Sequence, residues 1–104
     1  MQVLINSNNS IRMTEELQQR FAASVEDALE RFSEQLTRVE VHLTDENGEK
    51  SGAQDKRCQI EARIKAREPV SASHKADSLE IALDGSLDKL QSVLESTLGK
   101  LQRA

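Results

Sequence analysis

The sequence predicts one α+β domain with the element order β-α-β-β-β-α, in which two helices pack on one face of a four-stranded sheet. Two stretches carry apolar residues every three or four positions, which is typical of amphipathic helices. Two others alternate apolar and polar residues, which is typical of strands with one face in water. A chain of 104 residues, 37% of them hydrophobic, can form one modest core. Helices with a single apolar stripe cover one face of such a sheet and leave the other exposed.

The first strand is expected at residues 2–6, followed by a polar turn. Thr14 is a suitable N-cap for the first helix, and Glu15 and Glu16 follow it where the helix dipole favours negative charge. The apolar stripe of this helix extends over about five turns. It consists of Leu17, Phe21, Val25, Ala28, Phe32 and Leu36. The opposite side is acidic, so we expect it to face water rather than phosphate.

Strict alternation predicts the next two strands. Residues 37–45 place two valines and a leucine on one side. Within residues 56–67, the even positions from Cys58 to Ala66 carry small or apolar side chains, and the odd positions from Arg57 to Arg67 carry charged or polar ones. The polar, glycine-containing segment 45–55 between them is expected to form a mobile hairpin loop.

The last strand is expected to begin at Val70, after a three-residue loop at 67–69. A hairpin centred on this loop pairs Ala66 with Val70 and Ile64 with Ala72, so that inward residues face inward partners. The three strands after the first helix then form an antiparallel meander.

The second helix is expected to begin with Asp77 as its N-cap and Glu80 as the capping-box partner. Its stripe consists of Leu79, Leu83, Leu87, Leu90, Leu94, Leu98 and Leu101. We interpret this stripe as packing on the sheet, with a coiled-coil dimer as the alternative. Gly85 within the helix costs about 1 kcal/mol relative to alanine, which indicates close packing at this position.

The composition argues against several functional classes. A net charge of −4 argues against binding of nucleic acid by overall charge. Two Phe and no Trp or Tyr give no platform for stacking single-stranded bases. No apolar run approaches the roughly 18 residues of a membrane span, and residues 1–6 lack the features of a secretion signal.

The sequence contains no recognisable catalytic or metal-binding arrangement. His42 is expected to point outward and His74 inward, with no nucleophile and base beside them. Cys58 and the histidines are not at zinc-ligand spacing, and Cys58 is expected to be a small buried apolar residue. We therefore expect no enzymatic activity, no cofactor, no metal and no small-molecule substrate.

The polar side of segment 56–67 is locally basic, with four cations and one carboxylate. Neighbouring strands add cations to the same predicted face. The resulting candidate phosphate-binding residues are Arg38, Arg57, Arg63, Lys65, Arg67 and Lys75. The alternative is a solvated face whose cations pair with Glu40 and Glu61 across the strands.

Over nearly its whole length the sequence resembles the short ribosome hibernation-promoting factors of the ribosome-associated inhibitor family. The resemblance rests on the element order, on Met13-Thr14-Glu15-Glu16-Leu17 and on Val70-Ser71-Ala72-Ser73. Its strongest part is Ala82-Leu83-Asp84-Gly85-Ser86-Leu87-Asp88-Lys89-Leu90. It implies a fold similar to a double-stranded-RNA-binding domain with an added N-terminal strand. It also implies binding of the small ribosomal subunit and its rRNA, where mRNA and tRNA would otherwise lie, and inhibition of translation in resting or stressed cells.

Within this resemblance the outward cations are expected to contact rRNA phosphates, and Lys89 and Lys100 match basic positions of the family's second helix. Between these two lysines the sequence departs from the family pattern, with Ser92, Glu95, Ser96 and Leu98 where cations are expected. Fewer phosphate contacts imply weaker ribosome binding with a smaller salt dependence, or a divergent member with another partner.

The resemblance is to the short class, because family members that pair ribosomes do so through a long C-terminal extension and this chain ends at Ala104. We therefore expect a single domain over residues 1–104, and a cytoplasmic monomer that acts by occlusion without contacting a membrane. The alternative is a small protein-interaction module without ribosome binding, which could form a homodimer through the leucine-rich helix or a sheet edge.

Overall fold

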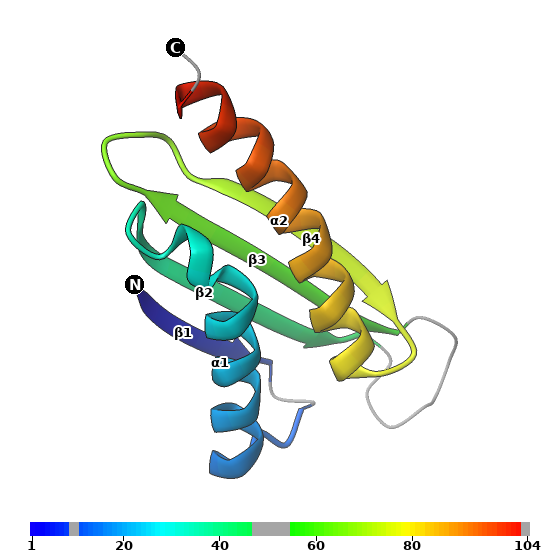
Figure 1. Ribbon diagram of the computed structural model, residues 1–104. Helices are drawn as coiled ribbons and strands as arrows, with labels where there is room; N and C mark the ends of the chain where they lie inside the picture. The colour runs from blue at the N-terminus through cyan, green and yellow to red at the C-terminus, as the bar shows by residue number, and fades with distance from the viewer. Residues whose placement is uncertain (9–10, 47–54, 103–104) are drawn as a thin grey trace.

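The computed structural model describes residues 1–8, 11–46 and 55–102, with side chains up to residue 99. The elements follow the predicted order (Figure 1). They are β1 (Gln2–Ser7), α1 (Glu15–Leu29), a 3-10 turn η1 (Glu30–Phe32), β2 (Leu36–Asp45), β3 (Lys56–Ile64), β4 (Val70–Ala76) and α2 (Leu79–Gln102). The α+β fold predicted from the sequence is therefore confirmed.

The four strands form one mixed sheet in the order β1-β2-β3-β4. β1 pairs with β2 in parallel, and the pairs β2–β3 and β3–β4 are antiparallel. Both helices lie on the same side of the sheet, with α1 toward β1 and α2 over β3 and β4 (Figure 1). The opposite side, called the outer face below, is not covered by any described element.

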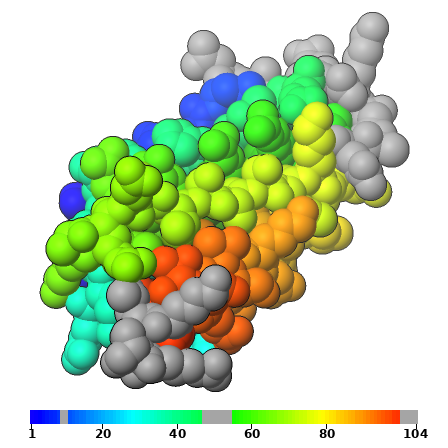
Figure 2. Space-filling model, turned by 90° about the horizontal axis from the view of Figure 1, so that it is seen from above, coloured from blue at the N-terminus to red at the C-terminus, as the bar shows by residue number. Residues whose placement is uncertain are grey.

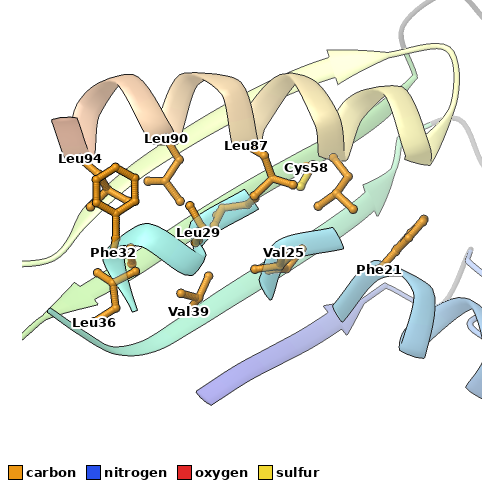
Figure 3. Packing of buried hydrophobic residues seen from close by; sticks show 14 of the residues in the cluster. Phe21, Val25, Leu29, Phe32, Leu36, Val39, Cys58, Leu87, Leu90 and Leu94 are labelled. Carbon is orange, nitrogen blue, oxygen red and sulfur yellow. The ribbon is translucent and has the colours of Figure 1, made fainter. Parts of the chain in front are cut away.

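The core lies between the helices and the inward side of the sheet (Figure 3). Val39 and Val41 of β2 and Ile60 of β3 are fully buried, as the alternation predicts. The leucines of α2 that lie in this core are Leu83, Leu87, Leu90, Leu94 and Leu98, none more than 6% exposed. Since the sheet covers this stripe, these leucines are not available as the seam of a coiled coil.

The first helix is shorter than predicted. α1 ends at Leu29, the 3-10 turn follows, and Leu36 is the first residue of β2. Backbone bonds from Ser33 N to Glu30 O (3.0 Å) and from Gln35 N to Phe32 O (3.0 Å) tighten the chain there. The apolar stripe predicted too long a helix, because Phe32 and Leu36 are buried in the same core as the helix residues although they lie beyond the end of α1.

The two helices begin with side-chain caps. Thr14 accepts a hydrogen bond from Leu17 N (3.1 Å), as predicted. In α2 the N-cap is Ser78 and not the predicted Asp77. Ser78 Oγ accepts a hydrogen bond from Ile81 N (3.2 Å). The carbonyl of Ser78 also accepts the bond from Ala82 N (3.0 Å), so the cap lies one residue later than predicted.

The pairing of β3 with β4 differs from the prediction. Val70 lies opposite Ala62 rather than Ala66, and Ala72 lies opposite Ile60 rather than Ile64. The connection is longer because β3 ends at Ile64, and residues 65–69 form the turn. A shift of four positions preserves the side on which each residue lies, so the inward and outward assignments within the strands remain correct.

The predicted mobile hairpin loop lies mostly outside the described residues. At its base, Glu46 N donates to Asp55 O (2.9 Å). Among the helices of the described chain, none has the length and hydrophobicity needed to cross a membrane.

Candidate nucleic-acid interface

The strand registers arrange the outer face in rows that run across the sheet. Residues opposite each other on β2, β3 and β4 share a row, because outward positions recur at every second residue. In order along the sheet, the rows are Arg38 and Arg63; Glu40, Glu61 and Ser71; His42, Gln59 and Ser73; and Thr44, Arg57 and Lys75. Below they are called the first cationic row, the carboxylate row, the polar row and the second cationic row. The predicted strand cations therefore share one face, but in two separate groups.

The first cationic row lies beside the carboxylate row. Arg38 Nη2 is 3.9 Å from Glu40 Oε1, and Arg63 Nε is 3.4 Å from Glu61 and 4.0 Å from Glu40. These distances exceed the approximately 2.7–2.9 Å of a strong charge-assisted hydrogen bond. In addition, Arg38 Nε is buried without a hydrogen-bond partner. The carboxylates thus offset the charge of both arginines, but they leave the Nε of Arg38 without an acceptor.

The second cationic row is less neutralised. Lys75 Nζ lies 3.3 Å from Glu46 Oε2, in a pair whose two side chains are exposed. Arg57 makes no ion pair with any residue that the structure describes. The alternative in which acids neutralise the outer face thus holds for Arg38 and Arg63 but not for Arg57.

Lys65 lies in the β3–β4 turn and not within β3, where the prediction had placed it, and Arg67 lies in the same turn, as its predicted place in the loop implied. Both are exposed, and neither is ion-paired within the described chain. Lys65 N donates to Gln35 O (2.9 Å), which places the turn at the end of the sheet where β2 begins and the first cationic row lies. The turn forms one end of the molecule in the space-filling view (Figure 2).

The two predicted lysines of the second helix do not belong to the outer face. Lys89 of α2 donates from Nζ to Ser73 O (3.1 Å), so its amine lies at the free edge of β4. Figure 2 shows this edge, with β4 exposed beside α2. The side chain of Lys100 lies outside the described residues, although its backbone continues α2.

A lysine that the sequence analysis did not single out is held by two carboxylates at the base of the β2–β3 hairpin. Lys56 Nζ lies 3.2 Å from Asp45 Oδ2 and 3.0 Å from Asp55 Oδ1. The hydrogen bond from Lys56 to Asp55 raises the pKa of the lysine, with a further contribution from Asp45. Asp45 and Asp55, at the two ends of the loop, were the feature of the sequence that could have predicted this pairing of Lys56. This lysine stabilises the hairpin and is not free for phosphate.

The helical side of the molecule has the opposite charge. Its exposed carboxylates include Glu15, Glu16, Glu26, Asp27, Glu30, Glu34, Glu80, Asp84, Asp88 and Glu95. Two of them bridge to the other helical segment: Arg20 pairs with Glu80 at 2.7 Å, and Arg31 pairs with Glu95. Because this side would repel phosphate, the outer face and the turn are the more favourable surfaces for a polyanion among the described residues.

Among the described residues, no group of three or more His, Cys, Asp or Glu side chains is placed to hold a metal ion. Cys58 is fully buried, and its Sγ accepts a hydrogen bond from Ser86 Oγ at 3.0 Å. Burial raises the pKa of the Cys58 thiol to about 11, so it stays protonated near neutral pH. Cys58 is therefore the small buried apolar residue that was predicted.

Comparison with known proteins identifies the family. The model of the Sigma 54 modulation protein / S30EA ribosomal protein family matches residues 4–102. No curated protein sequence is significantly similar to the chain. The chain has the fold of a ribosomal subunit interface protein from Coxiella burnetii, with a TM-score of 0.73 at 12% identity over 95% of this chain and 99% of that one. The N-terminal domain of Thermus thermophilus Protein Y is equally similar, with a TM-score of 0.73 at 13% identity over 93% and 99%. The chain thus belongs to the Sigma 54 modulation protein / S30EA ribosomal protein family.

Proposed function

We propose that this protein binds the small ribosomal subunit through its rRNA and inhibits translation in resting or stressed cells. It acts in the cytoplasm by occupying space that mRNA and tRNA require, without catalysis and without a cofactor. The family description names a ribosomal protein, and one protein of the same fold is a ribosomal subunit interface protein. Both agree with a ribosomal partner.

The observation that carries this proposal is the separation of charge between the two sides of the molecule. Cations on the outer face and in the β3–β4 turn are accessible, whereas the helical side exposes mainly carboxylates. Although the net charge is −4, the local excess of cations on this surface can therefore hold phosphates. The Glu partners of Arg38 and Arg63 do not prevent this, since ion pairs at partly exposed positions are worth about 1 kcal/mol or less.

Removal of two cations at the turn end tests the proposal. In the double variant Arg63→Gln, Lys65→Gln, we expect weaker cosedimentation with small subunits and a less steep dependence of log K on log salt. Each lost phosphate contact lowers this slope by about 0.7–0.9, so two lost contacts lower it by about 1.5. Binding is measured by pelleting at two salt concentrations, with folding checked by circular dichroism.

The matched control is Arg20→Gln, Arg31→Gln, which removes the same charge from the helical side. Both arginines are exposed and form surface ion pairs, so the fold should tolerate their loss. We expect this control to bind like the unmodified protein. Equal weakening in both variants would mean that net charge, not the outer face, governs binding. Absence of binding by the unmodified protein would contradict the proposed function itself.

Dimerisation through the leucine-rich helix, one of the two contacts considered for a protein-interaction module, is not favoured by the geometry. The leucine stripe that suggested a dimer is covered by the sheet.

A further inference from the structure

The outer face also indicates which form of RNA it fits, an inference that rests on the proposed function because it concerns the same surface. The chain has two Phe and no Trp or Tyr. Phe21 and Phe32 are buried in the core, 3% and 8% exposed. Apart from the single imidazole of His42, the outer face therefore has no aromatic ring, so it offers no platform on which successive unpaired bases can stack. Contacts must instead be made to the backbone and grooves of a folded RNA helix.

Spacing between the cationic rows sets where phosphates can bind. Arg63 and Arg57 lie six positions apart on β3, or roughly 20 Å at about 3.3 Å per residue. Between them lie the carboxylate row and the polar row. A phosphate is attracted to either cationic row and repelled by Glu40 and Glu61. The face therefore favours a ligand with two separated lines of phosphates and a phosphate-free strip between them.

The carboxylate row has capacity for a further hydrogen-bond donor. The side chains of Glu40 and Glu61 are 22% and 34% exposed, and their contacts to Arg38 and Arg63 are 3.4 to 4.0 Å long. An ionised carboxylate accepts hydrogen bonds and donates none. The phosphate-free strip of the ligand that faces these carboxylates must therefore present hydrogen-bond donors. The 2′-hydroxyl groups of RNA are such donors, and DNA lacks them.

We propose that the outer face binds across the minor groove of an A-form RNA helix, with Glu40 and Glu61 as specificity-determining residues that accept hydrogen bonds from 2′-hydroxyls. The two cationic rows contact the phosphates of the two strands that border the groove. This groove is wide and shallow in A-form RNA and displays the hydroxyls. In B-DNA the minor groove is only about 6 Å wide, and no hydroxyl compensates for the two carboxylates.

The test measures fluorescence anisotropy of two short RNA duplexes of one sequence, one unmodified and one fully 2′-O-methylated. Methylation keeps the A-form but removes the donor. We expect the unmodified protein to bind the methylated duplex about tenfold more weakly, as for loss of a hydrogen bond to a charged group. The variant Glu40→Ala, Glu61→Ala should bind both duplexes equally. The control Glu26→Ala, Glu30→Ala removes the same charge from the helical side and should retain the tenfold difference.

Equal affinity of the unmodified protein for both duplexes, or an unchanged difference in Glu40→Ala, Glu61→Ala, would overturn the inference. Should that variant fail to fold, Glu40→Gln, Glu61→Gln keeps the side-chain shape and is expected to reduce the difference. The result is separable from the ribosome experiment. Discrimination between duplexes without cosedimentation would contradict only the proposed function. Cosedimentation without discrimination would contradict only the RNA-groove inference.

Discussion

A single glycine determines how closely α2 approaches β4. A Cβ added at Gly85 would lie 2.2 Å from His74 Cδ2, too close for any real contact, whereas at Gly99 it would meet no atom within 4 Å. We expect Gly85→Ala to lower the free energy of unfolding by about 1–3 kcal/mol, because the overlap outweighs the gain in helix propensity. We expect Gly99→Ala to raise it by about 0.5–1 kcal/mol. Urea denaturation of both variants measures the contrast.

Removal of the obstructing ring is the control for this prediction. In His74→Ala, Gly85→Ala the overlap no longer exists, so much of the stability lost in Gly85→Ala should return. If Gly85→Ala proved as stable as Gly99→Ala, the His74 ring would have to move aside at little cost. Close packing at this glycine would then not be a constraint on α2.

The sequence predicted much at the level of single residues but not their partners. Close packing at Gly85 followed from the cost of a glycine within a helix, and the burial of Cys58 and the outward position of Arg57 and Arg63 followed from strand periodicity. The facing of Arg38 by Arg63 depends on the β2–β3 register, which alternation does not fix. The hydrogen bond from Lys89 to the carbonyl of Ser73 depends on how α2 lies beside the sheet. The resemblance of Lys89 to a basic position of the family's second helix did not predict this bond.

Among the elements, the β3–β4 turn carries the clearest backbone strain. Ala66 has a φ of 59°, in the left-handed region that glycine adopts without a steric penalty. We expect Ala66→Gly to raise the free energy of unfolding by about 0.5–1 kcal/mol, because relief of about 1–2 kcal/mol of strain exceeds the added entropy of glycine in the unfolded chain. The control Ala23→Gly, at an exposed position of α1, should lower it by about 1 kcal/mol. Chemical denaturation distinguishes the two, and a loss of stability in both would show that the turn is unstrained.

Element type was easier to predict than element length. Charged and small residues continue to alternate as far as Arg67, although β3 ends at Ile64. The same happens in the first helix, whose apolar spacing continues through the 3-10 turn into β2. In both cases the pattern reports which residues are buried or exposed, and burial persists after the hydrogen-bonded element has ended. A backbone conformation such as that of Ala66, which no glycine marks, leaves no signal in the pattern.

For the molecule as a whole, topology turns a modest local excess of cations into a candidate interface. Three consecutive strands bring Arg38, Arg63 and Lys75 to one side, while the acidic helix faces lie on the other. The alternation predicted this division. The separation into two cationic rows with carboxylates between them required the registers, and it changes the expected ligand from a generic polyanion to one with two lines of phosphate.

The burial of the leucine stripe also bears on the state of association. With Leu87, Leu90 and Leu94 covered by the sheet, dimerisation through α2 would first require that the helix leave the core. We expect the 104-residue chain to sediment at equilibrium as a monomer of 11.6 kDa at micromolar concentration. Sedimentation equilibrium is preferable to gel filtration, because the molecule measures 50 × 25 × 19 Å and its elongation would raise the apparent mass. A mass near twice this value would require an interface outside the leucine stripe. The uncharged strand β1 at the sheet edge would be the first surface to test, by a Leu4→Lys substitution, because Leu4 lies opposite the outward residue Glu40 whereas Ile5 packs against the core.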